Sequence, residues 1–342
     1  MTLDSIDIAV LLPCYNEAAT IADVVKGFAR ALPSATIYVY DNNSTDNTYE
    51  IAALAGALAV REPRQGKGHV VRRMFADIEA DLYIMADGDG TYDPKDAPKL
   101  VEKLLQDRCD MVVGTRAGVH DDAGRTGHAF GNRLFNAIYR QMFGADFTDI
   151  LSGYRVFTRR YVKSFPAVSG GFEIETEMSV HAGQLRLPIA EIELNYGRRP
   201  EGSHSKLSTF KDGFKILVMF ARLMQATQPF RFYGIISMFL FLGAILFAIP
   251  PVTEYLTTGL VNRVPTWIAA VGMLLLATVM SFSGLILNSV AKGRAEQKRL
   301  SYLAQPPVRG EMRPRPAGKE RRKSPKKQTI EAPSVAMEDQ DA

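Results

Sequence analysis

Two carboxylates, Asp87 and Asp89, are separated by a single glycine and follow a short apolar run, residues 82–86. The run is typical of a buried strand, and Gly88 lets the backbone turn sharply and approach a ligand. Two neighbouring carboxylates repel each other unless a cation lies between them. Mg²⁺ suits such a pair, because it takes one or two carboxylates together with substrate phosphates. The pattern predicts a divalent-cation site, with a solvated Asp-Gly turn as the alternative.

The elements that must position this pair are short strands alternating with helices. The other expected strands are residues 6–12, 37–40, 58–60 and 111–114. Such alternation predicts a mostly parallel, Rossmann-like α/β sheet with right-handed crossovers. In these sheets ligands bind beyond the carboxyl ends of the strands. The polar side chains expected there are Glu17, Asp41, Asp87 and Arg116.

The chemistry of these side chains suits a nucleotide. Glu17 and Asp41 can accept hydrogen bonds from a ribose or from the edge of a base. Lys67 lies in a Gly-Lys-Gly loop that opens a helix, where free amides and one cation suit a phosphate. Each feature also has an ordinary explanation, because residues 42–44 are a common turn and helix cap and Lys67 could be a solvated charge. Their convergence at one sheet edge favours a binding site.

Several classes of protein are disfavoured. The loop around Lys67 lacks the spacing of a Walker motif, and no GxGxxG follows the first strand. An EF-hand would need Gly in place of Tyr92 and Glu in place of Pro98. The two cysteines and five histidines lack zinc-ligand spacing. Residues 291–342 carry 13 Lys and Arg against 7 Asp and Glu, which leaves the first 290 residues near −2, so no nucleic-acid partner is expected.

Two uncharged runs, residues 232–253 and 264–291, meet the length of about 20 residues that a membrane helix needs. A pair of buried core helices is the alternative. Two spans form a hairpin, and Lys and Arg are concentrated on both of its flanks. The positive-inside rule therefore places the N-terminal domain and the tail in the cytoplasm. Asp4 and Asp7 argue against a signal peptide at the N-terminus.

Residues 210–224 have the pattern of an amphipathic helix, with Phe210 and Phe214 on one face and Lys211 and Lys215 on another. Such a helix lies in the membrane interface. From residue 309 the tail is rich in Pro, Lys and Arg and is expected to be disordered. The expected division is a catalytic domain over 1–205, a juxtamembrane helix over 206–229, two transmembrane helices within 230–291 (about 232–253 and 265–290), and a basic, largely disordered cytoplasmic tail over 292–342.

Five motifs occur in order: 13–17 (PCYNE), 41–46 (DNNSTD), 66–68 (GKG), 87–89 (DGD) and 113–116 (VGTR). This series resembles the family-2 glycosyltransferases of GT-A fold. Within them it is most similar to the branch of dolichyl-phosphate mannose synthase and bacterial polyprenyl-phosphate sugar transferases. The resemblance covers roughly residues 6–215. It implies Mg²⁺ or Mn²⁺ at Asp87 and Asp89, and a nucleotide sugar bound by Pro13, Tyr15, Glu17, Asp41, Lys67, Ala86, Asp87 and Gly88.

One departure from the family concerns the residues after the second aspartate. Relatives often carry Leu-Gln there, whereas this chain has Gly90-Thr91. A contact from that Gln to the metal or donor is therefore not expected, and the identity of the sugar stays open.

The acceptor side rests on three segments. Residues 149–155 resemble the acceptor-side motif of the family. Residues 198–206 resemble the cationic segment that closes over the phosphates, with about one residue more, and an interfacial lipid-binding loop is the alternative. Glu173 and Glu177 lie one helical turn apart, on a solvated face or at the site. The resemblance implies acceptor-side roles for Ser152, Arg155, Arg198 and Ser205, and catalytic roles for Asp89, Arg116, Asp149, Arg199 and Lys206.

The resemblance implies transfer of a sugar, with inversion, from a UDP- or GDP-sugar to polyprenyl (undecaprenyl) phosphate at the cytoplasmic face of the inner membrane. A phosphomonoester is mostly doubly ionised at neutral pH, so it needs no strong base. The alternatives are a hydroxyl-bearing lipid or glycan acceptor with Asp149 as base, and a non-enzymatic, membrane-anchored nucleotide-sugar-binding scaffold. A processive synthase would carry Gln-x-x-Arg-Trp, but the single Trp is Trp267. Association into a homo-oligomer stays open.

Overall fold

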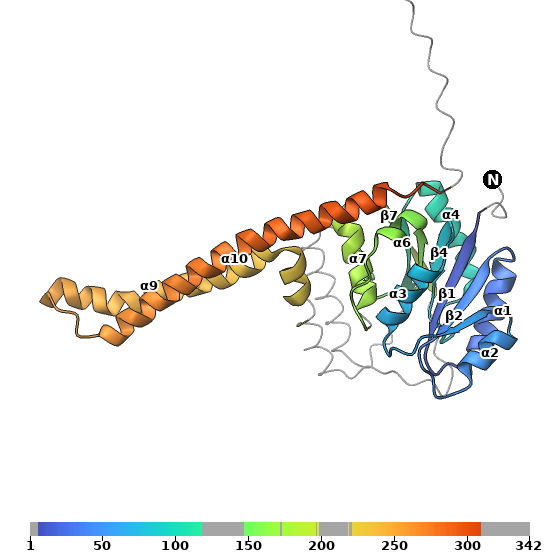
Figure 1. The fold of residues 1–342 in the computed structure, drawn as a ribbon, viewed down its shortest axis with the longest axis horizontal. Helices are drawn as coiled ribbons and strands as arrows, with labels where there is room; N and C mark the ends of the chain where they lie inside the picture. Colours follow the sequence, from blue (N-terminus) through green and yellow to red (C-terminus); the bar gives the residue numbers. More distant parts are fainter. Residues whose placement is uncertain are drawn as a thin grey trace, which may run out of the picture.

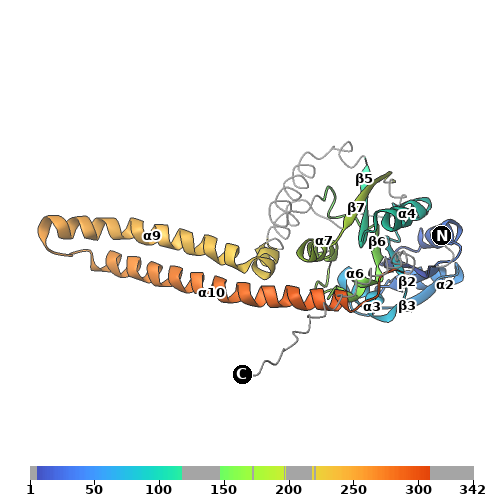
Figure 2. The ribbon, with the colours of Figure 1, turned by 90° about the horizontal axis from the view of Figure 1, so that it is seen from above.

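The computed structural model describes residues 6–117, 147–171, 173–195, 197, 218 and 221–308. Within these residues, a seven-stranded sheet carries helices on both faces, and two long helices project from it as an arm (Figure 1). The two arm helices run side by side (Figure 2). The strands are β1 (Ile8–Cys14), β2 (Thr36–Asp41), β3 (Leu58–Arg61), β4 (Leu82–Met85), β5 (Met111–Ala117), β6 (Arg155–Thr158) and β7 (Ile189–Asn195). The helices are α1 (Ile21–Ala31), α2 (Thr48–Leu54), α3 (Lys67–Asp77), η2 (Pro94–Asp96), α4 (Ala97–Asp107), α6 (Arg159–Ser164), α7 (Ile174–Leu185), α9 (Pro229–Thr258) and α10 (Val264–Leu303).

The strand order is β3-β2-β1-β4-β6-β5-β7. All five strands expected from the sequence are present, and β1 pairs in parallel with both β2 and β4. The mostly parallel α/β sheet is therefore confirmed. Two strands were missed in the sequence, β6 and β7. Strand β6 inserts antiparallel between β4 and β5, and β7 continues the sheet parallel to β5.

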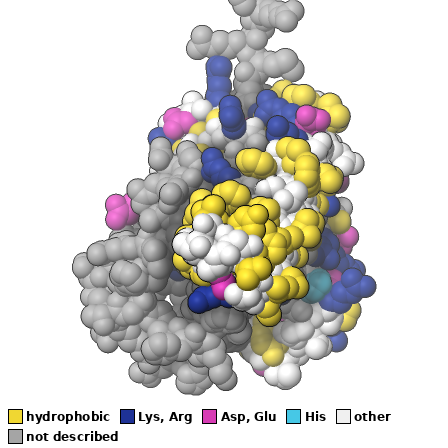
Figure 3. Space-filling view, turned by 90° about the vertical axis from the view of Figure 1, so that its left-hand side faces the viewer, with side chains coloured by type: hydrophobic (Ala, Val, Ile, Leu, Met, Phe, Trp, Pro, Cys, Tyr) yellow, Lys and Arg dark blue, Asp and Glu magenta, His cyan; other side chains and the backbone are white. Residues whose placement is uncertain are grey.

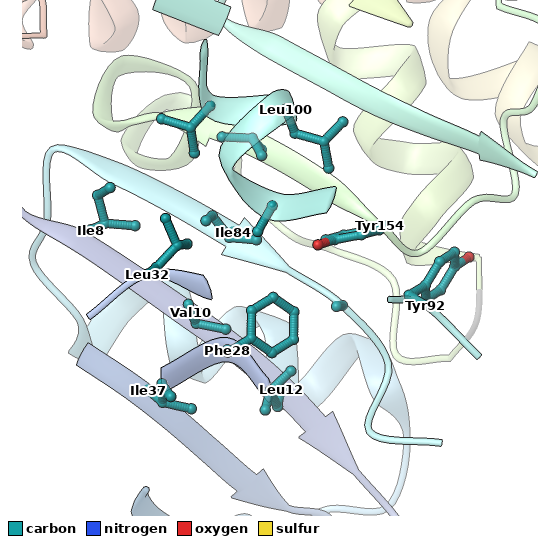
Figure 4. Close-up of a cluster of buried hydrophobic side chains, with 14 of the residues drawn as sticks. Ile8, Val10, Leu12, Phe28, Leu32, Ile37, Ile84, Tyr92, Leu100 and Tyr154 are labelled. Carbon is teal, nitrogen blue, oxygen red and sulfur yellow. The ribbon is translucent and has the colours of Figure 1, made fainter. Parts of the chain in front are cut away.

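Alternate residues of the central strands feed two separate apolar cores. Ile8, Val10 and Leu12 of β1 point to the face covered by α1 and α4, where they join Phe28 (Figure 4). Ala9 and Leu11 point to the opposite face, which α3, α6 and α7 cover. Burial on both faces explains why β1 is apolar over its whole length rather than alternating. The sheet is therefore an interior layer whose polar chemistry is confined to its edges.

The helices α9 and α10 contain the two expected membrane spans. Only 11% and 17% of their most apolar stretches are buried, which contradicts the alternative of buried core helices. Figure 3 looks along the arm and shows hydrophobic side chains gathered over it. Helix α9 continues through Pro250 and Pro251 to Thr258, although a proline inside a helix removes one backbone hydrogen bond. By length, composition and exposure, both helices suit a membrane.

Small residues bring the two arm helices together. Ser237 of α9 donates to the backbone oxygen of Ala277 at 2.8 Å, and its hydroxyl lies 2.8 Å from that of Ser281. A side chain at Gly284 would meet Cβ of Tyr233 at 3.1 Å, so the backbones are close. Small residues and interhelical hydroxyl contacts are typical of helix pairs in lipid, where lipid tails provide no hydrophobic driving force.

The C-terminal part of α10 leaves the arm and docks on the sheet domain. Arg299 donates to the backbone oxygen of Leu185 at 2.9 Å, and the hydroxyl of Tyr302 donates to Oδ2 of Asp110 at 2.8 Å. Val308 follows and is only 4% exposed. The tail expected over 292–342 thus begins as a helix that continues to Leu303, before residue 309, from which disorder is expected. The many charged residues of this segment gave no indication that Tyr302 and Val308 would be buried against the domain.

Two other expected segments are described only in part. Residues 221–227 are helical and fall within the range 206–229 of the expected juxtamembrane helix, which stays a prediction. Residues 206–217 and 309–342 lie outside the described residues.

We predict that replacing Tyr302 loosens the docked end of α10. Tyr302→Phe removes one hydrogen bond, at a cost of about 1 kcal/mol, whereas Tyr302→Ala also removes the buried ring, at a cost of about 3 kcal/mol. Amide hydrogen exchange over residues 298–304 measures both costs. Leu303→Ala is the matched control, because Leu303 is 62% exposed. Equal exchange in Tyr302→Ala and Leu303→Ala would contradict the docking.

A second prediction concerns pH. His181 of α7 is completely buried, with Nε2 3.0 Å from the Ser164 hydroxyl. Burial and the nearby Lys298 lower the pKa of His181 from 6.5 to about 3. The folded protein therefore resists protonation that the unfolded chain accepts below pH 6.5, so stability falls as the pH falls from about 6.5 towards 3, by about 1.4 kcal/mol per pH unit. Unfolding in detergent at pH 7.5, 6.5 and 5.5 measures this loss. His181→Gln is expected to flatten it, and an unchanged slope would refute the assignment.

Candidate active site

The carboxyl ends of β1, β2 and β4 meet at one edge of the sheet. Cys14 and Asp41, the last residues of β1 and β2, are register partners. Gly88 follows β4, and a Cβ there would lie 2.4 Å from both Sγ of Cys14 and Oε2 of Glu17. Only glycine permits this approach, which brings the segment after β4 against the segment after β1. The structure thus brings Glu17, Asp41 and the Asp87–Asp89 segment to the same edge.

The loops after β1 and β2 lock each other in place. The backbone N–H of Asn16 donates to the Ser44 hydroxyl at 2.9 Å, and that of Thr45 donates to Oδ1 of Asn16 at 2.8 Å. The N–H of Glu17 donates to the Thr48 hydroxyl at 2.8 Å. These bonds fix the backbone around Tyr15 and Glu17, both half-buried. The loop after β2, in which residues 42–44 were also explained as an ordinary turn, therefore braces the predicted nucleoside-binding residues Tyr15 and Glu17.

Asp41 is 3% exposed and has spare acceptor capacity. Its Oδ2 accepts from the N–H of Ser44 at 3.3 Å, while Oδ1 is buried without a hydrogen-bond partner among the described residues. A buried, unpaired carboxylate oxygen is costly unless a donor is supplied. The neighbouring Asn42 holds the loop after β3, since it accepts from the N–H of Gly66 at 2.7 Å. Asp41 therefore fits a ligand that brings an N–H or O–H to this edge.

The two carboxylates after β4 have different surroundings. The side chain of Asp87 is 29% exposed. Asp89 is only 7% exposed, and its Oδ1 accepts from the N–H and hydroxyl of Thr91, at 3.1 and 2.6 Å. Thr91, part of the departure from the family, thus positions Asp89.

The donor set fits a hard divalent cation. The described residues contain no cluster of three or more His, Cys, Asp or Glu that could hold a metal. Mg²⁺, however, requires only one or two carboxylates when substrate phosphates complete its shell. Asp87 and Asp89 are therefore sufficient for a metal that arrives with a diphosphate.

Lys67 lies between two carboxylates. Its Nζ is 2.5 Å from Oδ1 of Asp87 and 2.6 Å from Oε1 of Glu175. Burial opposes the positive charge, but the two carboxylates outweigh it and raise the pKa of Lys67 above its ordinary value. Lys67 is thus a structural cation here as well as a predicted phosphate ligand. The sequence did not predict this role for Glu175, because the expected candidates on this helix were Glu173 and Glu177.

Glycines make this position of Lys67 possible. A Cβ at Gly66 would lie 2.2 Å from the backbone oxygen of Gly170, and one at Gly68 would lie 2.1 Å from that of Ser169. The Gly-Lys-Gly loop therefore packs backbone to backbone against the segment before α7. Glu177 holds the same segment, because its carboxylate accepts from the N–H groups of Val168 and Ser169 at 2.9 and 2.8 Å.

Arg116 and Asp149 form a two-point ion pair. Nε and Nη2 of Arg116 donate to Oδ2 and Oδ1 of Asp149 at 2.7 and 2.8 Å. Burial raises the pKa of Asp149, but the hydrogen bonds and charge of Arg116 outweigh it, so the pKa lies below its ordinary value. A carboxylate held in this way is a weak proton acceptor. The pair joins the end of β5 to the predicted acceptor-side motif.

The acceptor-side motif is held from within. Ser152 is completely buried, and its hydroxyl donates to the backbone oxygen of Gly114 at 2.5 Å. Arg155 is also completely buried, and it donates to the backbone oxygens of Ile150 and Ser152 at 2.7 and 2.8 Å. These two side chains can affect an acceptor only through the loop that they hold. A Cβ at Gly153 would lie 2.8 Å from Oδ2 of Asp87, so the loop borders the carboxylate pair.

The remaining predicted residues fall into two groups. Pro13, Ala86 and Gly88 are buried and shape the edge through their backbone and small size. Arg198, Arg199, Ser205 and Lys206 lie outside the described residues.

We predict that Gly68→Ala destabilises the domain. The added methyl group would collide with backbone atoms of Ser169 and Gly170, which cannot rotate away, so the cost is about 2 kcal/mol. Denaturant unfolding measures it. Gly293→Ala is the matched control, since no atom lies within 4 Å of a Cβ there, and a helix-interior alanine is expected to gain up to about 1 kcal/mol. Equal stability of the two variants would disprove the close packing of this loop.

Comparison with known proteins shows which family the chain resembles. Residues 9–165 match the profile of the family described as Glycosyl transferase family 2. Glycosyltransferase AglJ of Haloferax volcanii is 33% identical over 298 residues, which cover 86% of this chain and 98% of the relative. The dolichyl-phosphate hexose transferase of the same organism is 26% identical over 210 residues, which cover 61% of this chain and 90% of the relative.

A solved structure shares the fold. Glucosyl-3-phosphoglycerate synthase from Mycobacterium tuberculosis, in complex with Mn²⁺, UDP and glucosyl-3-phosphoglycerate, is 26% identical with a TM-score of 0.53. The match covers 64% of this chain and 79% of that one. The chain thus belongs to glycosyl transferase family 2, and it is a glycosyltransferase of GT-A fold.

Proposed function

We propose that this enzyme transfers a sugar from a nucleoside diphosphate sugar to a polyprenyl phosphate at the cytoplasmic face of a membrane. One observation carries the proposal. Helix α10 exposes apolar side chains over its N-terminal part and docks its C-terminal end on the domain that contains the site. A water-soluble donor and a membrane-embedded acceptor require this combination. Lys and Arg on both flanks of the hairpin support the cytoplasmic side.

The donor side follows from the sheet edge. Oδ1 of Asp41, which has no hydrogen-bond partner among the described residues, is suited to an N–H of the base or an O–H of the ribose. Asp87 and Asp89 would hold Mg²⁺ or Mn²⁺, which offsets the negative charge of the leaving diphosphate. Because the similar synthase was solved with UDP and Mn²⁺, UDP-sugars are the first donors to test, and GDP-sugars are the second.

The acceptor side favours a phosphate over a hydroxyl group. A phosphomonoester has its second pKa at about 6, so it is already a nucleophile at neutral pH. A hydroxyl acceptor would need Asp149 as a base, but Arg116 occupies both of its oxygens and lowers its pKa. The similarity to a dolichyl-phosphate hexose transferase supports the same choice.

The residues of this chain then have defined tasks. Asp149 fixes the guanidinium of Arg116 at the end of β5, where a cation offsets the approach of two anions. Arg155 and Ser152 hold the loop that borders Asp87 at Gly153. Arg199 and Lys206, which lie outside the described residues, are proposed to steady the acceptor and the departing nucleotide. Attack by the phosphate oxygen opposite the leaving group inverts the anomeric carbon.

The experiment uses purified full-length enzyme with labelled UDP- and GDP-sugars and either undecaprenyl phosphate or undecaprenol. We expect transfer to the phosphate only. Asp89→Ala is expected to reduce the rate by about a thousandfold, because it removes electrostatic stabilisation of the leaving group. Asp107→Ala is the control, since Asp107 forms an exposed pair with Lys103 away from the site. Near-normal turnover in Asp89→Ala, or transfer to undecaprenol alone, would refute the proposal.

A further inference from the structure

Glu175 is linked to Asp87, a predicted metal ligand, through Lys67. The ammonium group of Lys67 is shared between Asp87 and Glu175, and the three side chains differ in exposure. Lys67 is 9% exposed and Glu175 is 6% exposed, whereas Asp87 is 29% exposed. Asp87 is therefore the member of the trio that faces the site, and Glu175 is the member on the protein side.

Lys67 and Glu175 lie on segments that are braced together. The close packing of Gly66 and Gly68 against residues 169–170 joins the start of α3 to the loop before α7. Arg72 adds to this brace, because it donates to the backbone oxygens of Ala167 and Val168 at 2.6 and 2.9 Å. Glu175 lies in the first turn of α7, directly after this loop. The Lys67–Glu175 pair is thus held by backbone contacts that do not involve Asp87.

The local charges point to a function for this arrangement. With Asp89 included, these three carboxylates and one ammonium carry a formal charge of −2, and Glu17 and Asp41 at the same edge add to the negative charge that a divalent cation would offset. Without Glu175, Lys67 would pair with Asp87 alone, and a divalent cation would have to compete with the full charge of that ammonium group. With Glu175, the ammonium keeps a buried partner when Asp87 turns to another ligand.

We propose that Glu175 is a positioning residue that retains Lys67 and so leaves Asp87 available to the divalent cation of the donor. This inference rests on the proposed function, in which Asp87 and Asp89 hold that cation. Lys67 then has two tasks: it keeps Asp87 in place before the donor arrives, and it remains beside Glu175 afterwards.

A purely structural role makes a different prediction. If the trio only held α3 to α7, loss of either Lys67 or Glu175 would loosen the site and weaken metal binding in both cases. A positioning role predicts that the two substitutions change the metal affinity in opposite directions. Glu175→Gln leaves Lys67 to Asp87 and weakens metal binding, whereas Lys67→Gln removes the competing cation and strengthens it.

The test is Mn²⁺ binding to purified full-length protein, measured from the electron paramagnetic resonance signal of free Mn²⁺, with and without UDP. We expect Glu175→Gln to weaken binding by about tenfold and Lys67→Gln to tighten it by about as much, within the usual range of coupling between sites. In the Lys67→Gln background, Glu175→Gln is expected to change the Mn²⁺ affinity by less than about threefold, because Glu175 acts on the metal site through Lys67, which is then absent. Glu50→Gln, which breaks an exposed pair with Arg61, is the control and should leave the affinity unchanged.

The outcomes separate this inference from the function on which it rests. Wild-type protein without saturable Mn²⁺ binding, with or without UDP, would overturn the metal site and this inference together. Saturable wild-type binding with weakening in both variants, or with no change in either, would overturn the inference alone. Thermal unfolding of each variant confirms that it is folded, and if Glu175→Gln fails to fold, the sign of the change in Lys67→Gln decides.

Discussion

The buried ammonium group of Lys67 joins three segments that are far apart in the sequence: the start of α3, the end of β4 and the first turn of α7. Its position depends on glycines, because Gly66 and Gly68 let the backbone of α3 approach residues 169–170 to distances that no side chain permits. The absence of a side chain also permits close approach at two other glycines: Gly88 borders Glu17, and Gly153 borders Asp87. The site is thus built by close backbone approach, and its charges are arranged within the space that remains.

Much of the fold could be predicted from the sequence because the strands at its centre are buried on both faces. Ile8 to Leu12 and Leu82 to Met85 are apolar without interruption, and such runs can be recognised without any partner. Strand β6 could not be recognised, because it begins with a charged residue, Arg155, which also ends the acceptor-side motif. The buried guanidinium donates to the backbone oxygens of Ile150 and Ser152 in its own loop and to the Ser179 hydroxyl on α7. The docked end of α10 escaped notice for a similar reason, since one buried Tyr within a charged helix has no periodic signal.

The position of the site at one edge of the sheet could be predicted from the sequence, whereas the contacts within the site could not. Polar residues that follow parallel strands must gather at one edge, so Glu17, Asp41 and Asp87 were expected together, and the structure places them there. Partners supplied by loops were not predictable. Nothing in the spacing of Glu175 indicates that it pairs with Lys67, more than a hundred residues earlier. The sequence likewise does not indicate that Thr91 donates a hydrogen bond to Asp89. These contacts depend on how the loop before α7 packs, which is a tertiary property.

Helix α7 connects the two functional halves of the molecule. Its first turn carries Glu175 beside the carboxylates, and its last residues accept hydrogen bonds from Lys298 and Arg299 of α10. The arm docks at the opposite edge of the sheet from the site, since Asp110 precedes β5 and Thr158 ends the antiparallel β6. The carboxyl edge is therefore not covered by α10, and α7 contacts both the site and the docked end of α10.

The central claim is that the nucleophile is the phosphate of a lipid. The most direct measurement is ³¹P nuclear magnetic resonance of the extracted lipid after reaction with a labelled nucleotide sugar. The account predicts that the monoester resonance of the polyprenyl phosphate is replaced by that of a phosphodiester coupled to the anomeric position of the sugar. A monoester resonance that persists while the sugar becomes attached through a hydroxyl oxygen would contradict it.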